Sequence, residues 1–164
     1  NAEVVSKLAF EYLILTAVRT KEVLDATWDE IDEKEHVWTI PENRMKAGKE
    51  HRVPLSSQAM RVLEQMKVNG KTDGNYVFAN NSKKGHLSNM VFAMILRRLD
   101  VKATAHGFRS SFRDWCSECT NAPREVAEAA LAHAVRDQVE AAYRRTDLFD
   151  KRRELMQQWA DYIT

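Results

Sequence analysis

The feature that most constrains the fold is a change of hydrophobic period near residue 27. Before it, Val4 to Val18 is mostly apolar and rich in helix formers, which predicts a buried helix. After it, Thr27–Ile31 and His36–Ile40 alternate apolar and polar side chains, the period of two that indicates β-strands. All four residues between these segments, 32–35, are charged and form a polar turn. A small sheet therefore interrupts a largely helical chain.

A third strand is predicted at Glu50–Val53, where Pro54 ends it because proline cannot donate to a strand ladder. The preceding segment, Lys46–Lys49, is a hairpin tip, since Gly48 permits the positive φ that tight turns require. We therefore predict an α+β fold, mainly α-helical with a small three-stranded antiparallel sheet.

Further helices are predicted where apolar residues recur at helical spacing or a capping residue opens the segment. Thr20, Ser57 and Ser88 are the expected caps, and Pro123 suits a first helical turn. The apolar side of the last helix covers either this domain's own core or a neighbouring molecule. The expected ranges are 21–26, 57–68, 88–99, 106–119, 123–131, 137–144 and 148–163.

Length and composition predict one globular domain with a substantial core. The chain has 164 residues, of which 44% are hydrophobic and 30% charged, so extended disorder is excluded. No apolar run reaches the length of a membrane span, and the start shows no signal-peptide pattern. Because the first residue is Asn1 and not Met, we expect a fragment of a longer protein.

The net charge of +1 conceals an uneven distribution. Residues 1–35 carry 4 basic and 9 acidic groups, residues 36–102 carry 12 and 5, and residues 103–164 carry 9 and 10. The central segment, with a balance of +7, is either a face for a polyanion or a solvated lysine-rich surface.

The two cysteines, Cys116 and Cys119, stand one helical turn apart. A single C-x-x-C pair is weak evidence for zinc, so core or surface thiols in a reducing compartment are the simpler interpretation. A zinc-stabilised DNA-binding domain using these cysteines with His106 and His133 is an alternative, but their spacing matches no common zinc pattern.

A histidine and an arginine in His106-Gly107-Phe108-Arg109 suggest phosphate chemistry. Three residues apart on a helical turn, His106 and Arg109 point the same way, and a guanidinium fork matches a phosphate. Tyr143 is a plausible nucleophile if phosphate-binding groups elsewhere complete a site. Candidates for those groups are Arg19, Lys46 and His133.

Each candidate also has an ordinary structural explanation. Arg19 could simply pair with Glu22 three residues on, and Arg109 could lie on a helix surface. The histidines could be buried and bonded to backbone. Tyr143 could be a core aromatic packed against Val139 one turn earlier.

Six segments in a fixed order span nearly the whole chain. They are Leu15–Glu22, Met45–Gly48, His51–Leu55, His106–Arg109, Leu131–His133 and Ala141–Tyr143. On these segments the chain resembles the catalytic domain of the tyrosine recombinases, the lambda-integrase family, and more narrowly the integrases of prophages and genomic islands. The resemblance implies the DNA breaking-rejoining fold of that family.

The resemblance implies a role for each candidate. Arg19 and Arg109 would clamp the scissile phosphate, with Glu22 buttressing Arg19. Lys46 would protonate the leaving 5′ oxygen, because the family's lysine directly precedes a small residue and a glycine; Lys49 is its rival. His106 would bind the phosphate or help deprotonate the tyrosine, and His133 would donate a hydrogen bond to a non-bridging oxygen.

The resemblance also implies the reaction and its setting. Tyr143 would attack a DNA phosphate to give a 3′-phosphotyrosine and a free 5′ hydroxyl, followed by strand exchange and religation, with no metal and no other cofactor. The partner would be double-stranded DNA attachment sites, bound by a homotetramer that is monomeric when isolated. The enzyme would be cytoplasmic, bacterial or phage-encoded, and would not associate with a membrane.

Residues 1–164 would then form the catalytic domain, a carboxyl-terminal fragment without the amino-terminal DNA-clamping and arm-binding domains. Such a fragment is expected to bind DNA weakly alone. The alternative is a DNA-binding or regulatory module of the same fold that has lost catalysis.

Overall fold

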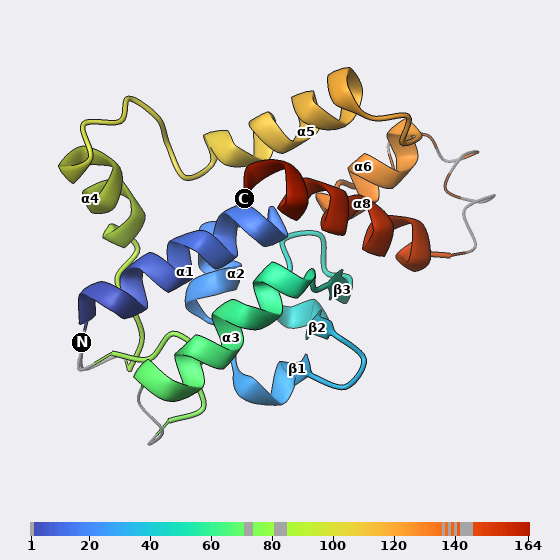
Figure 1. The fold of residues 1–164 in the computed structure, drawn as a ribbon. Helices are drawn as coiled ribbons and strands as arrows, with labels where there is room; N and C mark the ends of the chain where they lie inside the picture. The colour runs from blue at the N-terminus through green and yellow to red at the C-terminus, as the bar shows by residue number, and fades with distance from the viewer. Residues whose placement is uncertain are drawn as a thin grey trace.

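The computed structural model describes residues 2–70, 74–80, 85–135, 137, 139, 141 and 146–164. Over these residues the chain is mainly helical with one three-stranded antiparallel sheet, which confirms the predicted fold class (Figure 1). The elements are α1 (Ala2–Thr16), α2 (Thr20–Leu24), the 3₁₀ helix η1 (Trp28–Glu30), β1 (Ile31–Asp32), β2 (Val37–Ile40), the 3₁₀ helix η2 (Glu42–Arg44), β3 (His51–Pro54), α3 (Ser57–Asn69), α4 (Val91–Arg98), α5 (Gly107–Cys119), α6 (Arg124–Ala130) and α8 (Phe149–Ile163). Within the described ranges, no helix is both long and apolar enough to cross a membrane.

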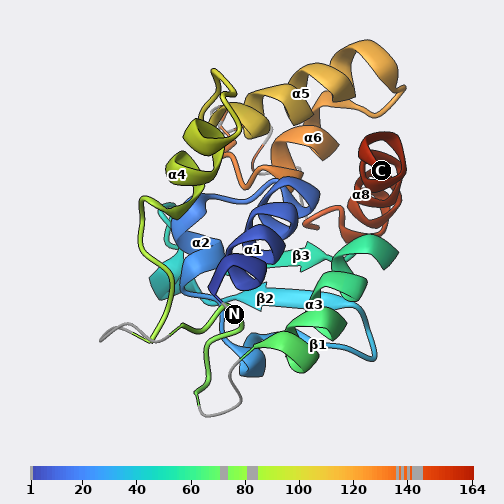
Figure 2. The same cartoon turned by 60° about the vertical axis from the view of Figure 1, so that its left-hand side comes forward.

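The sheet packs its inner face against α1 and α3, which lie side by side over it (Figure 2). The strands follow the order β1-β2-β3, with Trp38 opposite Val53 and Ile40 opposite His51. Trp38 is fully buried, and its ring centroid lies 5.4 Å from that of Tyr12 on α1. Alternation along β2 therefore directs every second side chain into this core, as the sequence period predicts.

A second core joins α5, α6 and α8 on the side of α1 away from the sheet (Figure 1). The rings of Phe112 and Trp115 on α5 contact Trp159 on α8, with centroids 5.5 and 5.1 Å from it. The Trp159 indole Nε1 also donates to the Ile14 carbonyl on α1 at 2.8 Å. The last helix therefore covers the chain's own core, which answers the question that the sequence left open.

The prediction of a strand at Thr27–Ile31 is wrong for its first part. Residues Trp28–Glu30 form the 3₁₀ helix η1, and only Ile31 and Asp32 pair with β2. The Glu30 carboxylate turns inward, accepting bonds from Trp38 Nε1 at 2.8 Å and from Arg44 Nε and Nη2 at 2.9 and 2.6 Å. Distant partners thus override the local alternation.

The hairpin tip is where the sequence predicts it, at Lys46–Lys49. Gly48 has a φ of +65°, and its amide donates to the Met45 carbonyl at 3.0 Å. The third strand is also confirmed, although it begins at His51 and includes Pro54.

Two predicted helix caps are displaced by one residue. Arg19, not Thr20, precedes α2, and its amide donates to the Glu22 carboxylate at 2.9 Å. Ser56, not Ser57, caps α3, its Oγ accepting from the Ala59 amide at 3.2 Å. The helix expected over 88–99 begins only at Val91. Most of the expected helix 137–144 lies outside the described residues.

The buried pair of Glu30 with Arg44 supports the base of the hairpin, since their side chains are only 8% and 18% exposed. We expect Glu30→Gln to lower the free energy of unfolding by about 3 kcal/mol, because it leaves a largely buried guanidinium without its counter-charge. Glu33→Gln is the matched control, because Glu33 pairs with Lys67 at the surface; its cost should stay below about 1 kcal/mol. Urea unfolding of both variants measures the difference, and equal losses would contradict the assignment.

Candidate active site

Arg109 is a buried cation that joins the ends of three helices. It lies on the first turns of α5 and is 6% exposed. Its Nη1 donates to the Ala17 carbonyl at 2.6 Å and its Nη2 to the Leu131 carbonyl at 2.7 Å. These carbonyls lie just past the ends of α1 and α6, where helix geometry leaves oxygens without an intrahelical partner. The guanidinium therefore holds the turns that follow α1 and α6 against α5.

The electrostatic setting of Arg109 favours a bound anion. Burial, together with the charge of Arg19, lowers the pKa of Arg109 to about 10, while Glu22 acts in the opposite direction. The group stays protonated at neutral pH. None of the carboxylates in the described residues forms an ion pair with it, and two carbonyl bonds leave further N–H donors of the five available. A desolvated cation with spare donors is suited to a phosphate.

Arg19 is oriented by Glu22, so the predicted pair exists. Arg19 Nη1 lies 3.0 Å from Glu22 Oε1, and the Glu22 side chain is only 4% exposed. Arg19 is the N-terminal cap of α2, and both its backbone amide and its side chain donate to the Glu22 carboxylate. The Arg19 side chain is therefore anchored at the start of the helix. The remainder of the guanidinium is partly exposed and lines an open hollow.

This clamp hollow, with a volume of about 800 Å³, brings together three of the predicted site residues. Arg19 contributes from the start of α2, Lys46 from the hairpin tip and His133 from the turn after α6. Arg109 is close enough for its charge to interact with that of Arg19. Arg19 and His133 are more than a hundred positions apart in the chain. They lie close together because Arg109 bonds to the carbonyls of Ala17 and Leu131, which precede them by two residues each.

His133 is held by an ion-pair chain on its outer side. Its Nδ1 lies 2.5 Å from Glu128 Oε2, and Glu128 Oε1 accepts from Arg113 Nε at 2.9 Å. Although burial by itself raises the pKa of Glu128, hydrogen bonds from Arg113 and His133 outweigh it and hold that pKa below its usual value. Glu128 therefore remains ionised and orients the imidazole, leaving Nε2 for another partner.

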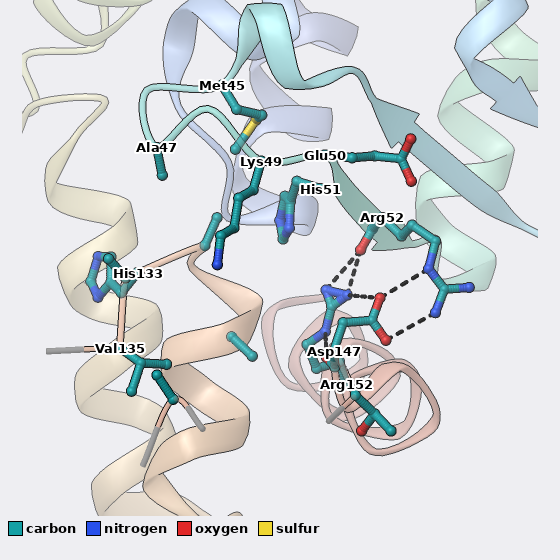
Figure 3. A pocket seen from close by; sticks show the side chains of 15 residues that line it. Met45, Ala47, Lys49, Glu50, His51, Arg52, His133, Val135, Asp147 and Arg152 are labelled. Atoms are coloured by element: carbon teal, nitrogen blue, oxygen red, sulfur yellow. Dashed lines mark hydrogen bonds and ion pairs between the residues drawn. The ribbon is translucent and has the colours of Figure 1, made fainter. Parts of the chain in front are cut away.

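A second cavity, the hairpin hollow, adjoins the clamp hollow and shares five lining residues with it: Ala47, Ala132, His133, Ala134 and Val135. Its volume is about 360 Å³, and Lys49 extends into it from the hairpin (Figure 3). Lys46 lines the clamp hollow, whereas Lys49 lines the hairpin hollow. The two lysines that are alternatives for the predicted general acid therefore line different, adjoining cavities.

His51 is a buried titratable group that the sequence analysis did not single out as a site residue. Burial, reinforced by the charges of Arg152, Arg109 and Arg19, lowers its pKa to about 3, and a hydrogen bond with the Ala130 backbone only partly compensates. The ring is therefore neutral beside three guanidinium groups. The sequence could have indicated that His51 is buried. Side chains alternate between the two faces of a strand, so His51 lies on the same inward face as Val53.

Among the described candidates, His106 is not part of this assembly. His106 directly precedes α5 and is exposed; its carbonyl accepts from the Arg109 amide at 3.1 Å, but its side chain does not line the clamp hollow. Tyr143 lies outside the described residues. The described part of the chain thus assembles Arg19, Lys46, Arg109 and His133.

The alternative zinc site is not assembled. Cys116 is buried in the second core, and burial raises the pKa of its thiol to about 12, which disfavours the thiolate that zinc requires. Cys119 is exposed. Cys116, Cys119, His106 and His133 are not gathered into a group that could hold a metal.

Comparisons with known proteins identify the family of the chain. The phage integrase family matches residues 1–148. The prophage integrase IntA of Escherichia coli K12 is 35% identical over 162 residues, which cover 96% of this chain and 38% of the relative. The integrase of Shigella phage Sf6 is 32% identical over 166 residues, covering 99% of this chain and 43% of the relative. The chain thus spans about two fifths of the length of these relatives.

Solved structures share the fold. The integrase from mycobacterium phage Brujita superposes with a TM-score of 0.73 at 17% identity, over 95% of this chain and 52% of that one. The XerA recombinase superposes with a TM-score of 0.60 at 17% identity, over 96% and 62%. The matched range and the identity with these relatives lead to one conclusion: the chain belongs to the phage integrase family of tyrosine recombinases.

Proposed function

We propose that residues 1–164 are the catalytic domain of an integrase that cuts and rejoins DNA at specific sites through a phosphotyrosine. The observation that carries this proposal is the clamp hollow, where Arg19, Lys46 and His133 meet beside the buried Arg109. Membership of the phage integrase family supports it.

In the proposed reaction, the two arginines bind the scissile phosphate. Arg109 has N–H donors to spare, and Arg19 is anchored by Glu22 with its outer part exposed. Guanidinium forks that are already placed by protein contacts need no reorganisation when negative charge grows on the phosphate oxygens. The same bonds that hold the fold together thus prepare the clamp.

Tyr143 is the proposed nucleophile. Its phenolic oxygen forms a bond to phosphorus while the bond from phosphorus to the 5′ oxygen breaks, and its proton passes to a base, for which we propose His106. Lys46 donates a proton to the departing 5′ oxygen, a role that suits an ammonium group on an exposed hairpin tip. The reverse reaction rejoins the strand, because the phosphotyrosine conserves the energy of the phosphodiester.

His133 is proposed to donate a hydrogen bond to a non-bridging oxygen of the phosphate. Its Nδ1 is engaged by Glu128, so Nε2 is the nitrogen that would face the phosphate. In this role Nδ1 would face Glu128 while Nε2 faces the phosphate.

The proposed substrate is double-stranded DNA carrying paired attachment sites. The basic segment 36–102 includes Lys46 and Lys49, which line the two hollows, and exposed Arg97 and Arg98 at the end of α4. Local positive charge of this kind binds a phosphate backbone even when the net charge is small. We propose four copies on paired sites and a monomer in isolation.

A suicide DNA substrate with a nick beside the cleavage site tests the reaction. The complete protein should become covalently joined to DNA, because the short fragment that carries the freed 5′ hydroxyl diffuses away and cannot attack the phosphotyrosine. Tyr143→Phe should form no adduct. Denaturing gel electrophoresis measures it. Adduct formation by Tyr143→Phe would mean that another residue attacks, whereas DNA binding without adduct in the unaltered protein would favour the catalytically silent module.

Arg109→Lys should lower the rate of adduct formation by about 10² to 10³, the typical loss when one stabilising donor is removed from an active site. An ammonium cannot bridge the Ala17 and Leu131 carbonyls and still present a planar fork. Arg61→Lys, on the exposed side of α3, is the matched control. Single-turnover cleavage compares the two, and equal rates would refute the clamp.

The choice between Lys46 and Lys49 is testable with a substrate whose leaving 5′ oxygen is replaced by sulfur. A thiolate leaves without a proton, so the cleavage defect of Lys46→Ala should largely disappear with this substrate. Lys49→Ala, in the neighbouring hollow, should show no such selective rescue. Rescue of Lys49→Ala alone would exchange the two assignments.

A further inference from the structure

Asp147 forms a bidentate ion pair with Arg52, at the entrance to α8. Arg52 Nε lies 2.9 Å from Asp147 Oδ2, and Arg52 Nη2 lies 2.9 Å from Oδ1 (Figure 3). Ninety-five positions separate the two residues in the chain. The pair thus joins the segment before α8 to β3, the strand that follows the hairpin tip.

Arg152 on α8 binds the backbone carbonyls of both Arg52 and Asp147. Its side chain is 1% exposed, and Nη1 and Nη2 donate to the Arg52 carbonyl at 2.7 and 2.6 Å. Its Nε donates to the Asp147 carbonyl at 2.9 Å, and Nη2 lies 3.7 Å from Asp147 Oδ2. One buried guanidinium therefore holds the backbone of both residues that form the outer pair.

The backbone between Asp147 and α8 makes a strained turn. Leu148 has a φ of 56° and a ψ of 35°, a left-handed conformation that is uncommon for a leucine. Phe149 follows, and the Arg52 guanidinium lies 4.3 Å above its ring. Such a conformation persists where surrounding contacts over-determine it. We call Arg52, Asp147, Phe149 and Arg152 the α8 lock.

The α8 lock lies close in sequence to the proposed nucleophile. Asp147 follows Tyr143 by four residues, and four residues of extended chain span at most about 14 Å. The other side of the lock, Arg52, belongs to the hairpin that carries Lys46. The lock thus connects the chain after the nucleophile to the hairpin that bears the proposed general acid.

The outer pair adds little to stability by itself. The side chains of Arg52 and Asp147 are 43% and 44% exposed, and ion pairs at that exposure contribute little to folding. Arg152, by contrast, is buried and structural. The Arg52–Asp147 pair is bidentate and therefore geometrically specific, although it adds little to stability. Such a pair is suited to fixing the position of the chain segment that carries Asp147.

We propose that the Arg52–Asp147 pair is a positioning device that sets where Tyr143 stands relative to the hairpin and the phosphate clamp. Arg52 and Asp147 are positioning residues and contact no reacting atom. This inference rests on the proposed function of Tyr143. It assigns to the pair an effect on the attack of the phenol and none on the protonation of the leaving group.

The test uses Asp147→Asn and Arg52→Gln in the complete protein with the suicide substrate. Each variant should slow adduct formation by about 3- to 5-fold, because a single exposed ion pair can shift a local equilibrium by about that factor. The double variant should be no slower than the slower single one, because the two changes break the same contact. Glu33→Gln, which breaks another exposed ion pair, is the matched control and should cleave at the normal rate.

Two further readouts separate positioning from a loss of structure. The thermal midpoint and DNA affinity of both variants should match those of the unaltered protein. A sulfur leaving group, which rescues loss of the general acid, should leave the defect of Asp147→Asn unchanged, because the fault is on the attacking side.

Each opposing result has a distinct meaning. Normal cleavage by Asp147→Asn and Arg52→Gln, in a preparation where the unaltered protein forms adduct, would overturn the positioning role alone. A fall in thermal midpoint or DNA affinity that matches the loss of rate would assign the pair to structure and also overturn it. Failure of the unaltered protein to form adduct would overturn the proposed function, and this inference with it.

Discussion

The two bonds from the buried Arg109 guanidinium are the interaction on which the rest of the site depends. They hold the carbonyls of Ala17 and Leu131, which end the turns after α1 and α6. Arg19 follows the first carbonyl by two residues, and His133 follows the second by two. One cation thus sets the separation of Arg19 and His133. Its charge is not neutralised, because its two partners are carbonyls and not a carboxylate, and its remaining N–H donors are available for the proposed phosphate.

Around this centre, four carboxylates each pair with a cationic group of the site or of the adjoining hairpin. Glu22 anchors Arg19, and Glu128 anchors His133. Glu30 holds Arg44 at the base of the hairpin, and Asp147 holds Arg52 on its outer strand. Each carboxylate restricts the direction of the cation with which it pairs, and the exposed pair of Arg52 with Asp147 contributes placement more than stability.

Local sequence predicted the sheet, the hairpin tip and most helices because these follow from side-chain period and from glycine geometry at Gly48. The failures have a common cause. Trp28–Glu30 curls into a 3₁₀ helix because Glu30 bonds to Trp38 and Arg44, which lie further along the chain. The caps shift by a residue at α2 and α3, where neighbouring polar residues compete for the same role. Arg152 interrupts the apolar stripe of α8, a local hint of a buried and paired cation.

The sequence by itself determined the family, the order of the six motifs and the chemical types that a phosphate site requires, because residue identity and short spacings carry that information. Tertiary structure alone decided that Lys46 and Lys49 line different hollows and that His51 stays neutral. It also decided that Arg152 reaches the Arg52 carbonyl across one hundred positions. These properties depend on burial and on contacts between distant segments, which no local period encodes.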